Sequence, residues 1–199
     1  MLRRSRIIGL SVLVVAGLLA AFAGFFAMSD QPRMIVSGTP QVGGPFTLTA
    51  HTGERMTDAA FRGDYMLVVF GFTHCADVCP AELQVITAAL DALGPEAERI
   101  QPLFITIDPE RDTPAHLAEY MGYFHPRLIG LTGTPEEIAS VAKAYHVWYE
   151  KVEEDGATDY MMDHTSITYL MGPDGKFIQH FSFGTSADDL AEALRGAVA

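Results

Sequence analysis

Two cysteines and one distant histidine are the residues of this chain best suited to chemistry. Cys75 and Cys79 are the only cysteines among the 199 residues, and they come shortly after an apolar run over 65–70. In α/β proteins, sites form where a buried strand ends and the next helix begins. Near that helix N-terminus the dipole and unpaired N–H groups lower the pKa of thiols. We therefore expect two thiolates of low pKa.

The four-residue spacing leaves three uses for the cysteine pair. Cα atoms so placed can come within the roughly 4.4 to 6.8 Å that a disulfide allows. The pair could be a reversible dithiol, two ligands of a metal ion, or an inert structural bridge. A bridge that closes so short a loop constrains the unfolded chain little. The sequence therefore favours redox or metal chemistry over a structural disulfide.

His164 is the candidate third ligand among seven histidines. It stands in the segment MMDHT (161–165), directly before an apolar run, so it could reach the rim of the sheet that carries the cysteines. Two soft thiolates and one imidazole suit copper, above all trigonal Cu(I). Hard cations prefer oxygen, and structural zinc takes four ligands. The set Cys75, Cys79 and His164 is therefore a candidate copper site.

Other polar and sulfur side chains have either a supporting role or none. Asp77 and Asp163 could orient ligands and offset charge, or be solvated loop carboxylates. His74 is the histidine best placed to tune the adjacent cysteine. Met161 and Met162 could offer thioethers, but neighbouring methionines more often serve packing. The remaining histidines are interpreted as surface or strand-end residues: His51, His116, His125, His146 and His180.

Hydrophobic patterning predicts the elements that position these residues. The run 65–70 is continuously apolar, as in a central strand buried on both faces. Further strands are predicted over 46–50, 102–107, 128–131, 165–171 and 176–182, and helices over 81–93, from 113, over 134–146 and over 187–198. The last two strands flank GPDG, a hairpin turn signal. Parallel strand–helix units followed by an antiparallel hairpin and a helix predict an α/β sandwich.

Residues 1–28 are predicted to be a membrane anchor. The run 7–28 contains 22 residues without a charge, enough at about 1.5 Å per residue for a helix to span a bilayer. The preceding arginines keep the N-terminus in the cytoplasm. A cleaved signal peptide is the alternative, since residues 21–23 (AFA) match a cleavage site, although the run exceeds the length of a signal h-region. In both cases the rest of the chain faces a compartment where disulfides persist.

Composition and charge indicate where the folded domain begins and which partners it excludes. Residues 29–44 are rich in Pro and Gly, which predicts a linker, and the folded domain is expected over 45–199. The formal net charge is −12, although three of the positive charges lie in the first six residues. So acidic a domain repels phosphate backbones. The sequence thus argues against nucleic-acid binding and favours metal ions or basic protein surfaces as partners.

The motifs around the cysteines and the histidine resemble the SCO/SenC family of copper-binding, thioredoxin-like proteins. The similarity covers about residues 42–197. It rests on FGFTHCADVCPAEL (70–83), FITIDPERDTP (104–114), FHPRLIGLTGTPEEI (124–138) and DHTSITYLMGPDGKF (163–177). This chain has Ala76 where the family motif usually has Pro between the cysteines.

The resemblance implies a fold, a ligand set and a role. The fold would be a thioredoxin-like α/β sandwich, and Cys75, Cys79 and His164 would bind one copper ion, Cu(I) or Cu(II). The role would be that of a copper chaperone that assists assembly of the CuA centre of cytochrome c oxidase. It would be anchored in the bacterial inner membrane with its domain in the periplasm. Implied partners are the oxidase subunit that bears CuA and, further, other periplasmic copper chaperones or thioredoxin-like reductants.

The sequence is compatible with two functions. A chaperone would pass copper to the docked subunit by ligand exchange, without turnover. A thiol-disulfide reductase would instead attack an oxidised cysteine pair of that subunit, and only then would Cys75 and Cys79 be catalytic. Dithiol exchange needs no histidine, so His164 favours copper. A thioredoxin-like peroxidase would need a Thr-x-x-Cys motif, which is missing because Thr73 lies two positions from Cys75.

Overall fold

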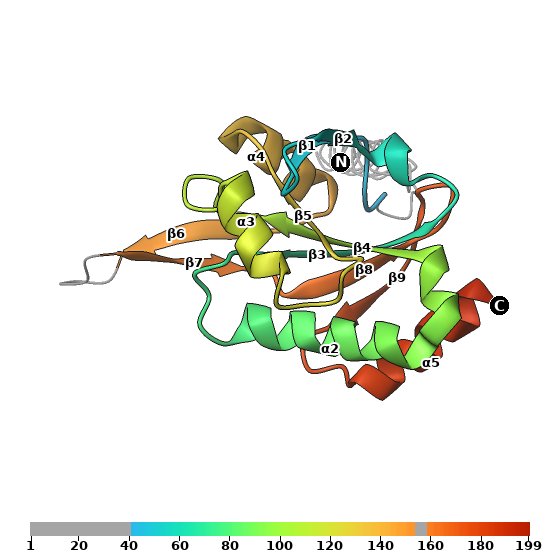
Figure 1. The fold of residues 1–199 in the computed structure, drawn as a ribbon. Coiled ribbons are helices and arrows are strands. Elements are labelled where there is room, and N and C mark those ends of the chain that lie inside the picture. The colour runs from blue at the N-terminus through green and yellow to red at the C-terminus, as the bar shows by residue number, and fades with distance from the viewer. Residues whose placement is uncertain (1–40, 154–158) are drawn as a thin grey trace, which may run out of the picture. The chain divides into compact units, whose positions relative to one another are not determined.

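The computed structural model describes residues 41–153 and 159–199. Its main element is a seven-stranded sheet of order β2-β1-β5-β4-β3-β8-β9 (Figure 1). The parallel strands β3, β4 and β5 form its middle, and the outer strands pair antiparallel. The strands are β1 Thr47–Ala50, β2 Arg55–Thr57, β3 Tyr65–Gly71, β4 Ile100–Thr106, β5 Ile129–Thr132, β8 Ile167–Met171 and β9 Phe177–Ser182.

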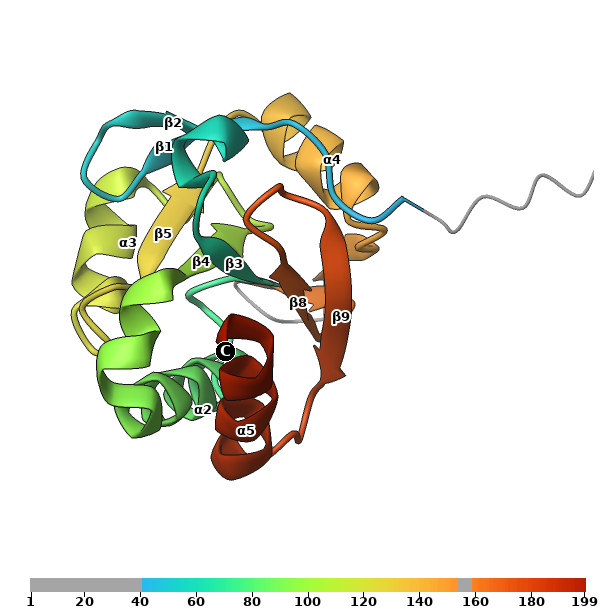
Figure 2. The same ribbon diagram turned by 90° about the vertical axis from the view of Figure 1, so that its right-hand side faces the viewer.

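Helices cover both faces of this sheet. The helices α2 (Val78–Leu93), α3 (Pro114–Met121) and α5 (Ala187–Val198) pack with one core cluster, and α4 (Pro135–Ala144) packs with the other. Figure 2 shows α2 and α5 on the side of the sheet opposite to α4. Two short 3-10 helices are also present, η1 (Asp58–Phe61) and η2 (Gly94–Arg99). The structure is thus the predicted α/β sandwich.

Local sequence explains where the helices begin. Thr113 accepts a hydrogen bond from the N–H of His116, and Thr134 forms a capping box with Glu137. Such side chains satisfy N–H groups that the first helical turn leaves free. Proline follows each threonine at the first helical position, where it fits best. The helix that carries Cys79 begins at Val78, three residues earlier than the predicted range.

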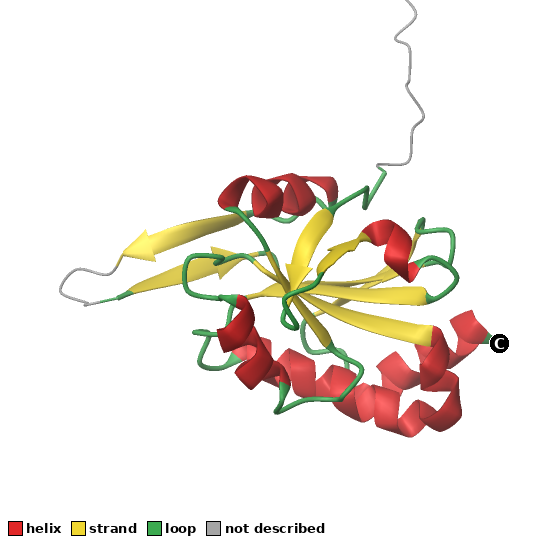
Figure 3. Cartoon of the chain, turned by 45° about the horizontal axis from the view of Figure 1, so that its top comes forward, coloured by secondary structure: helices red, strands yellow, loops and turns green. Residues whose placement is uncertain are grey.

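A second, two-stranded sheet projects from the body of the domain (Figures 1 and 3). It consists of β6 (Tyr149–Glu153) and β7 (Tyr160–His164), which pair antiparallel. Sequence patterning predicted neither strand, nor the short β2. The strand predicted from residue 165 begins only at Ile167, so His164 ends β7 rather than preceding β8 directly.

The predicted anchor lies outside the described residues, as does most of the predicted linker. Among residues 41–153 and 159–199, no helix is long and apolar enough to cross a membrane. At the end of the predicted linker, the Gly43 N–H donates to the Ala144 carbonyl at 2.8 Å, and Val42 packs against the core. Residues 42 and 43 therefore contact the domain.

Candidate metal centre

The two cysteines lie where interior strand β3 leads into α2. Cys79 is the second residue of α2 and is buried, while Cys75 is half-buried in the preceding loop. Gly71 lets the sulfur approach the strand, because a Cβ at this position would lie 2.9 Å from Cys79 Sγ and 2.8 Å from Phe104 Cε2. Both contacts are closer than real Cβ atoms make, so a side chain at residue 71 would displace its neighbours.

Cys75 occupies the place of a helix cap. The Cys79 N–H donates to Cys75 Sγ at 3.4 Å, and Asp77, the residue before α2, makes no capping hydrogen bond with its side chain. Hydrogen bonds from the Cys79 thiol and from the N–H groups of Cys79, Asp77 and Val78 outweigh burial and lower the pKa of Cys75 to about 5. Cys75 is therefore a thiolate at neutral pH, as predicted.

Cys79 differs from its partner. The hydrogen bond to Cys75, burial, and the negative charges of Cys75 and Glu82 raise the pKa of Cys79 well above its ordinary value. The Phe72 N–H works in the opposite direction without reversing the shift. The prediction of two low-pKa thiolates is thus wrong for Cys79, because two sulfurs so close share one negative charge. The metal-free pair holds one thiolate and one thiol.

His164 faces this pair from the hairpin. Its Nε2 lies 3.7 Å from Cys79 Sγ, and its Nδ1 lies 3.0 Å from the Thr165 carbonyl oxygen. Because a carbonyl only accepts hydrogen bonds, Nδ1 carries the proton, and Nε2 of the neutral ring presents its lone pair to the sulfur. Phe72 packs edge-on against the ring at 6.1 Å between centroids. The structure therefore places Cys79 beside both Cys75 and His164, although the ligand atoms of the three residues do not all lie within 4.8 Å of one another.

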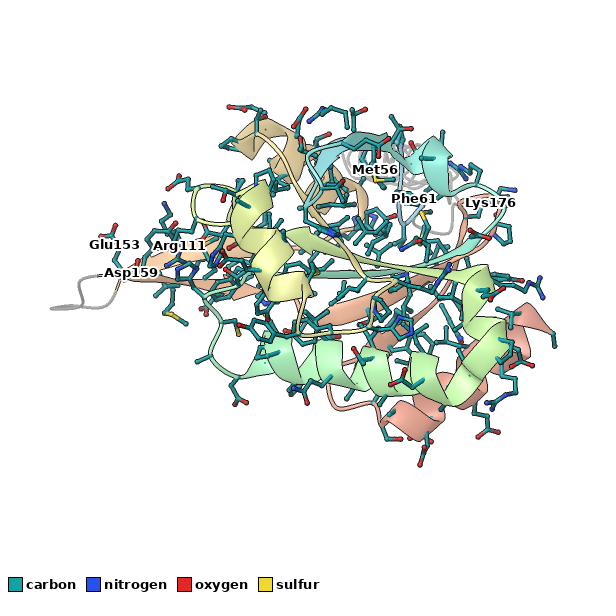
Figure 4. The ribbon with its side chains drawn as sticks, in the orientation of Figure 1. Met56, Phe61, Arg111, Glu153, Asp159 and Lys176 are labelled. Atoms are coloured by element: carbon teal, nitrogen blue, oxygen red, sulfur yellow. The ribbon has the colours of Figure 1, made fainter. Side chains whose placement is uncertain are left out.

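Arg111 fixes the hairpin to the loop after β4. Its guanidinium pairs with Asp108 and with Asp159, the latter at 3.0 Å, and donates to the Tyr160 carbonyl at 2.9 Å. It also stacks 3.7 Å from the centre of the Tyr160 ring, whose hydroxyl donates to Asp108 at 2.8 Å. Figure 4 shows Arg111 beside Asp159 at the hairpin. Since β7 runs from Tyr160 to His164, these contacts set where the histidine lies.

Glu82 is a buried acid that sequence analysis missed. It lies one turn after Cys79 on α2 and accepts a hydrogen bond from Thr168 at 2.5 Å. Burial raises its pKa, while the Thr168 hydrogen bond and the positive charge that His164 carries when protonated oppose that shift. The sequence carried only a weak signal for it, an acid at helical spacing from a cysteine.

The other sequence candidates have varied surroundings. Met162 is buried in the core, as expected of a packing residue, whereas Met161 is 41% exposed. Asp163 is exposed on β7 and pairs in register with Glu150. His74 turns toward Thr73 and Asp112 rather than tuning its neighbour, and it is not among the groups that shift the pKa of the adjacent cysteine. A role of Asp77 and Asp163 near a metal remains a prediction.

A dithiol at the start of the helix that follows an interior parallel strand, in a sheet closed by an antiparallel hairpin, defines the class of thioredoxin-like proteins. The comparisons narrow this class. A family model described as SCO1/SenC matches residues 36–199. The chain belongs to the SCO1/SenC family, as the resemblance indicated.

Individual relatives support this membership. A mitochondrial SCO1 homolog of Homo sapiens is 47% identical over 167 residues, which cover 83% of this chain and 56% of that protein. The structure of Bradyrhizobium japonicum ScoI with copper bound has 43% identity and a TM-score of 0.73, covering 78% of this chain and 99% of that chain. Arabidopsis thaliana ScoI with copper bound has 42% identity and a TM-score of 0.74, covering 79% and 98%. The chain spans about half the length of the curated relatives it matches.

Proposed function

We propose that this chain binds one copper ion, as Cu(I) or Cu(II), through Cys75, Cys79 and His164. The observation that carries the proposal is the position of His164, whose Nε2 lone pair faces Cys79 Sγ at 3.7 Å. A dithiol alone would not require an imidazole held in this way. Two thiolates and one imidazole are a donor set that suits copper. The copper-bound structures of the Bradyrhizobium and Arabidopsis relatives support it.

The residues prepare the site in different ways. Cys75 offers a thiolate before the ion arrives, while Cys79 gives up a proton on binding, so binding of copper releases about one proton from the pair. The Thr165 carbonyl holds the His164 ring in the tautomer that leaves Nε2 free. Since Cys75 is half-buried and Cys79 is buried, an acceptor would approach from the side of Cys75.

We propose further that the copper is cargo. The chain would act as a chaperone that docks on the subunit of cytochrome c oxidase that bears CuA and passes the ion to it by ligand exchange. Residues 1–28 would anchor it in the bacterial inner membrane, 29–44 would be the linker, and 45–199 would form the copper-binding domain in the periplasm. This role rests on family membership and on the resemblance of the motifs.

A thiol-disulfide reductase is the second candidate function. The unequal pair favours it, because a thiolate beside a thiol is the arrangement in which one cysteine attacks a disulfide and the other resolves the mixed disulfide. Cys75 would be the attacking residue, since it is the thiolate and the more exposed of the two. The substrate would be an oxidised cysteine pair on the same oxidase subunit.

Oxidase activity in cells that carry His164→Ala or Cys75→Ala separates the two functions. The full chain replaces the cells' own copy, and His180→Ala, an exposed histidine on β9, is the matched control. The chaperone proposal predicts that both site variants lose oxidase activity at limiting copper and that the control does not. Normal activity of His164→Ala at limiting copper, together with loss in Cys75→Ala, would contradict it and favour the reductase.

A further inference from the structure

We propose a second cation site, formed by His74, Asp112 and His116, that takes a divalent ion of the zinc and copper(II) class. One ligand atom from each residue lies within 4.8 Å of the others. His74 lies in the loop before α2, while Asp112 lies just before α3 and His116 lies in the first turn of α3. Two imidazole nitrogens and a carboxylate oxygen are ligands that Zn²⁺ and Cu²⁺ accept.

The three ligand atoms converge on one point, which the Thr73 hydroxyl marks. Thr73 Oγ1 lies 2.5 Å from Asp112 Oδ1, 2.9 Å from His116 Nε2 and 3.2 Å from His74 Nδ1. Side chains that merely share a surface do not all point at a single oxygen. Ligands of zinc lie about 2.0–2.2 Å from the ion, so the rings must move inward as the Thr73 hydroxyl turns away. Both histidines have room to move, since His74 is exposed and His116 is half-buried.

Asp112 is the fixed part of the site. Its side chain is fully buried, and it accepts hydrogen bonds from the Thr73 N–H at 3.1 Å and from the Thr106 hydroxyl at 2.5 Å. In the described part of the chain its ion-pair partner is a histidine, with His74 Nδ1 at 3.9 Å from Asp112 Oδ1. A buried carboxylate needs a positive partner to offset its lost hydration. A bound divalent cation would supply that charge.

The start of α3 holds the third ligand in place. Thr113 caps this helix by accepting from the His116 N–H, which puts His116 one turn after Asp112. The two imidazole rings are neighbours, with their centroids 5.4 Å apart and their planes tilted by 35°. With three protein ligands and an exposed histidine on one side, the fourth position is left to water, as in open zinc sites.

The site is independent of the proposed copper site. It uses none of Cys75, Cys79 and His164, and it offers nitrogen and oxygen where Cu(I) prefers sulfur. His74 is bonded to Cys75 in the chain, but its ring faces Thr73 and Asp112. The two sites would thus lie side by side and select different ions. The acidic domain, in a chain of net charge −12, favours the approach of cations to both.

Zinc titration of the full chain by calorimetry tests the proposal, in a Cys75→Ser/Cys79→Ser background that removes the thiolates. We expect one Zn²⁺ per chain, with the affinity reduced at least tenfold by His116→Ala and unchanged by His180→Ala. Absence of stoichiometric binding, or equal binding by these two variants, would overturn the proposal. Circular dichroism verifies that each variant is folded. If His116→Ala is not folded, the smaller change His116→Gln replaces it.

Electron paramagnetic resonance with Cu²⁺ gives a second readout in the same background. The proposal predicts nitrogen hyperfine coupling from two imidazoles, of which one is lost in His116→Ala. A chain with intact cysteines, preloaded with one Cu(I), should still bind one Zn²⁺. Release of the Cu(I) in step with zinc binding would place zinc at the cysteines and contradict a separate site. Loss of Zn²⁺ binding when the two cysteines are replaced by serine would also contradict a separate site.

Discussion

Cys79 and His164 face each other from parts of the molecule that are held in place by different forces. Cys79 sits on α2, after interior strand β3, and belongs to a large cluster of buried apolar side chains. His164 ends a strand of the projecting sheet β6–β7, in which most side chains are exposed or half-buried. The cysteine is thus positioned by packing, which tolerates little movement.

Besides the packing of Met162, Tyr149 and Tyr160 on the core, polar contacts hold the hairpin. Arg111, in the loop after β4, pairs with Asp159 and donates to the Tyr160 carbonyl, and the Tyr160 hydroxyl donates to Asp108 in the same loop. Such contacts can be broken without exposing the core, so the position of His164 can change while the dithiol stays in place. Binding of copper by His164 can therefore be weakened without unfolding the domain.

Removal of a thiolate should have the largest effect. In Cys75→Ala, Cu(I) binding should fall by more than the 10–100-fold that loss of a supporting group costs, because the ligand itself is gone. Competition with a Cu(I) chelator measures it. Met161→Ala, which removes an exposed sulfur of the hairpin, is the control and should bind normally. Equal losses in the two variants would mean that the dithiol is not the main anchor of the ion.

Release of the hairpin should come next. In Arg111→Ala the contacts to Asp108 and Asp159 are lost, so Cu(II) affinity should fall about 10–100-fold, as for other groups that orient ligands. Lys151→Ala is the matched control, because Lys151 also lies over the Tyr160 ring, at 4.0 Å, but forms only an exposed ion pair with Glu110. The rate at which the reduced dithiol reduces a dye-labelled test disulfide should equal the wild-type rate in both variants. If Arg111→Ala binds Cu(II) as the wild type does, the hairpin is not positioned as described.

A methyl group at residue 71, the last residue of β3, should press on the sulfur of Cys79. Gly71→Ala places a Cβ 2.9 Å from Cys79 Sγ, and such overpacking costs about 1–3 kcal/mol of stability. Urea unfolding measures it. Gly196→Ala in α5 has open space around its Cβ and should instead be neutral or stabilising by up to about 1 kcal/mol. Equal effects of the two substitutions would show that residue 71 is not tightly packed against Cys79.

The smallest expected effect is a shift in the pKa of Cys75, which leaves the fold intact. Because the pKa of Cys75 is about 5, its thiolate absorption should persist at neutral pH and disappear only as the pH falls through about 5. In Cys79→Ala the hydrogen bond from the second thiol, the largest cause of the shift, is lost, so the midpoint should rise toward the ordinary value. A wild-type midpoint near 9, or no rise in the variant, would argue against this pairing.

The same contrast explains what the sequence could predict. The apolar run of β3 and the helical spacing of α2 identify the dithiol arm, since both are buried in one core and packing forces the pattern. The hairpin strands YEKVE and YMMDH pair with each other outside the main sheet, so no alternation of buried residues marks them. The protonation of Cys79 depends on burial and on Cys75, which spacing alone does not reveal.

Interactions between distant segments were also out of reach. Asp112 lies in a motif that sequence analysis quoted, but its contact with Thr73 joins residues 39 positions apart. His116 was interpreted as a surface residue because nothing nearby in the chain suggests a ligand role. Glu82 and Thr168 are 86 positions apart. In each case the fold supplies a neighbour that periodicity and spacing do not encode.

X-ray absorption at the copper edge identifies the atoms that bind the ion. The full chain is loaded with one equivalent of copper, and the wild type is compared with His164→Ala and His180→Ala. We expect two sulfur neighbours and one imidazole nitrogen in the wild type and in His180→Ala. In His164→Ala we expect both sulfurs to remain and that imidazole to be lost. Copper without sulfur neighbours, or the same imidazole signal in His164→Ala, would contradict it.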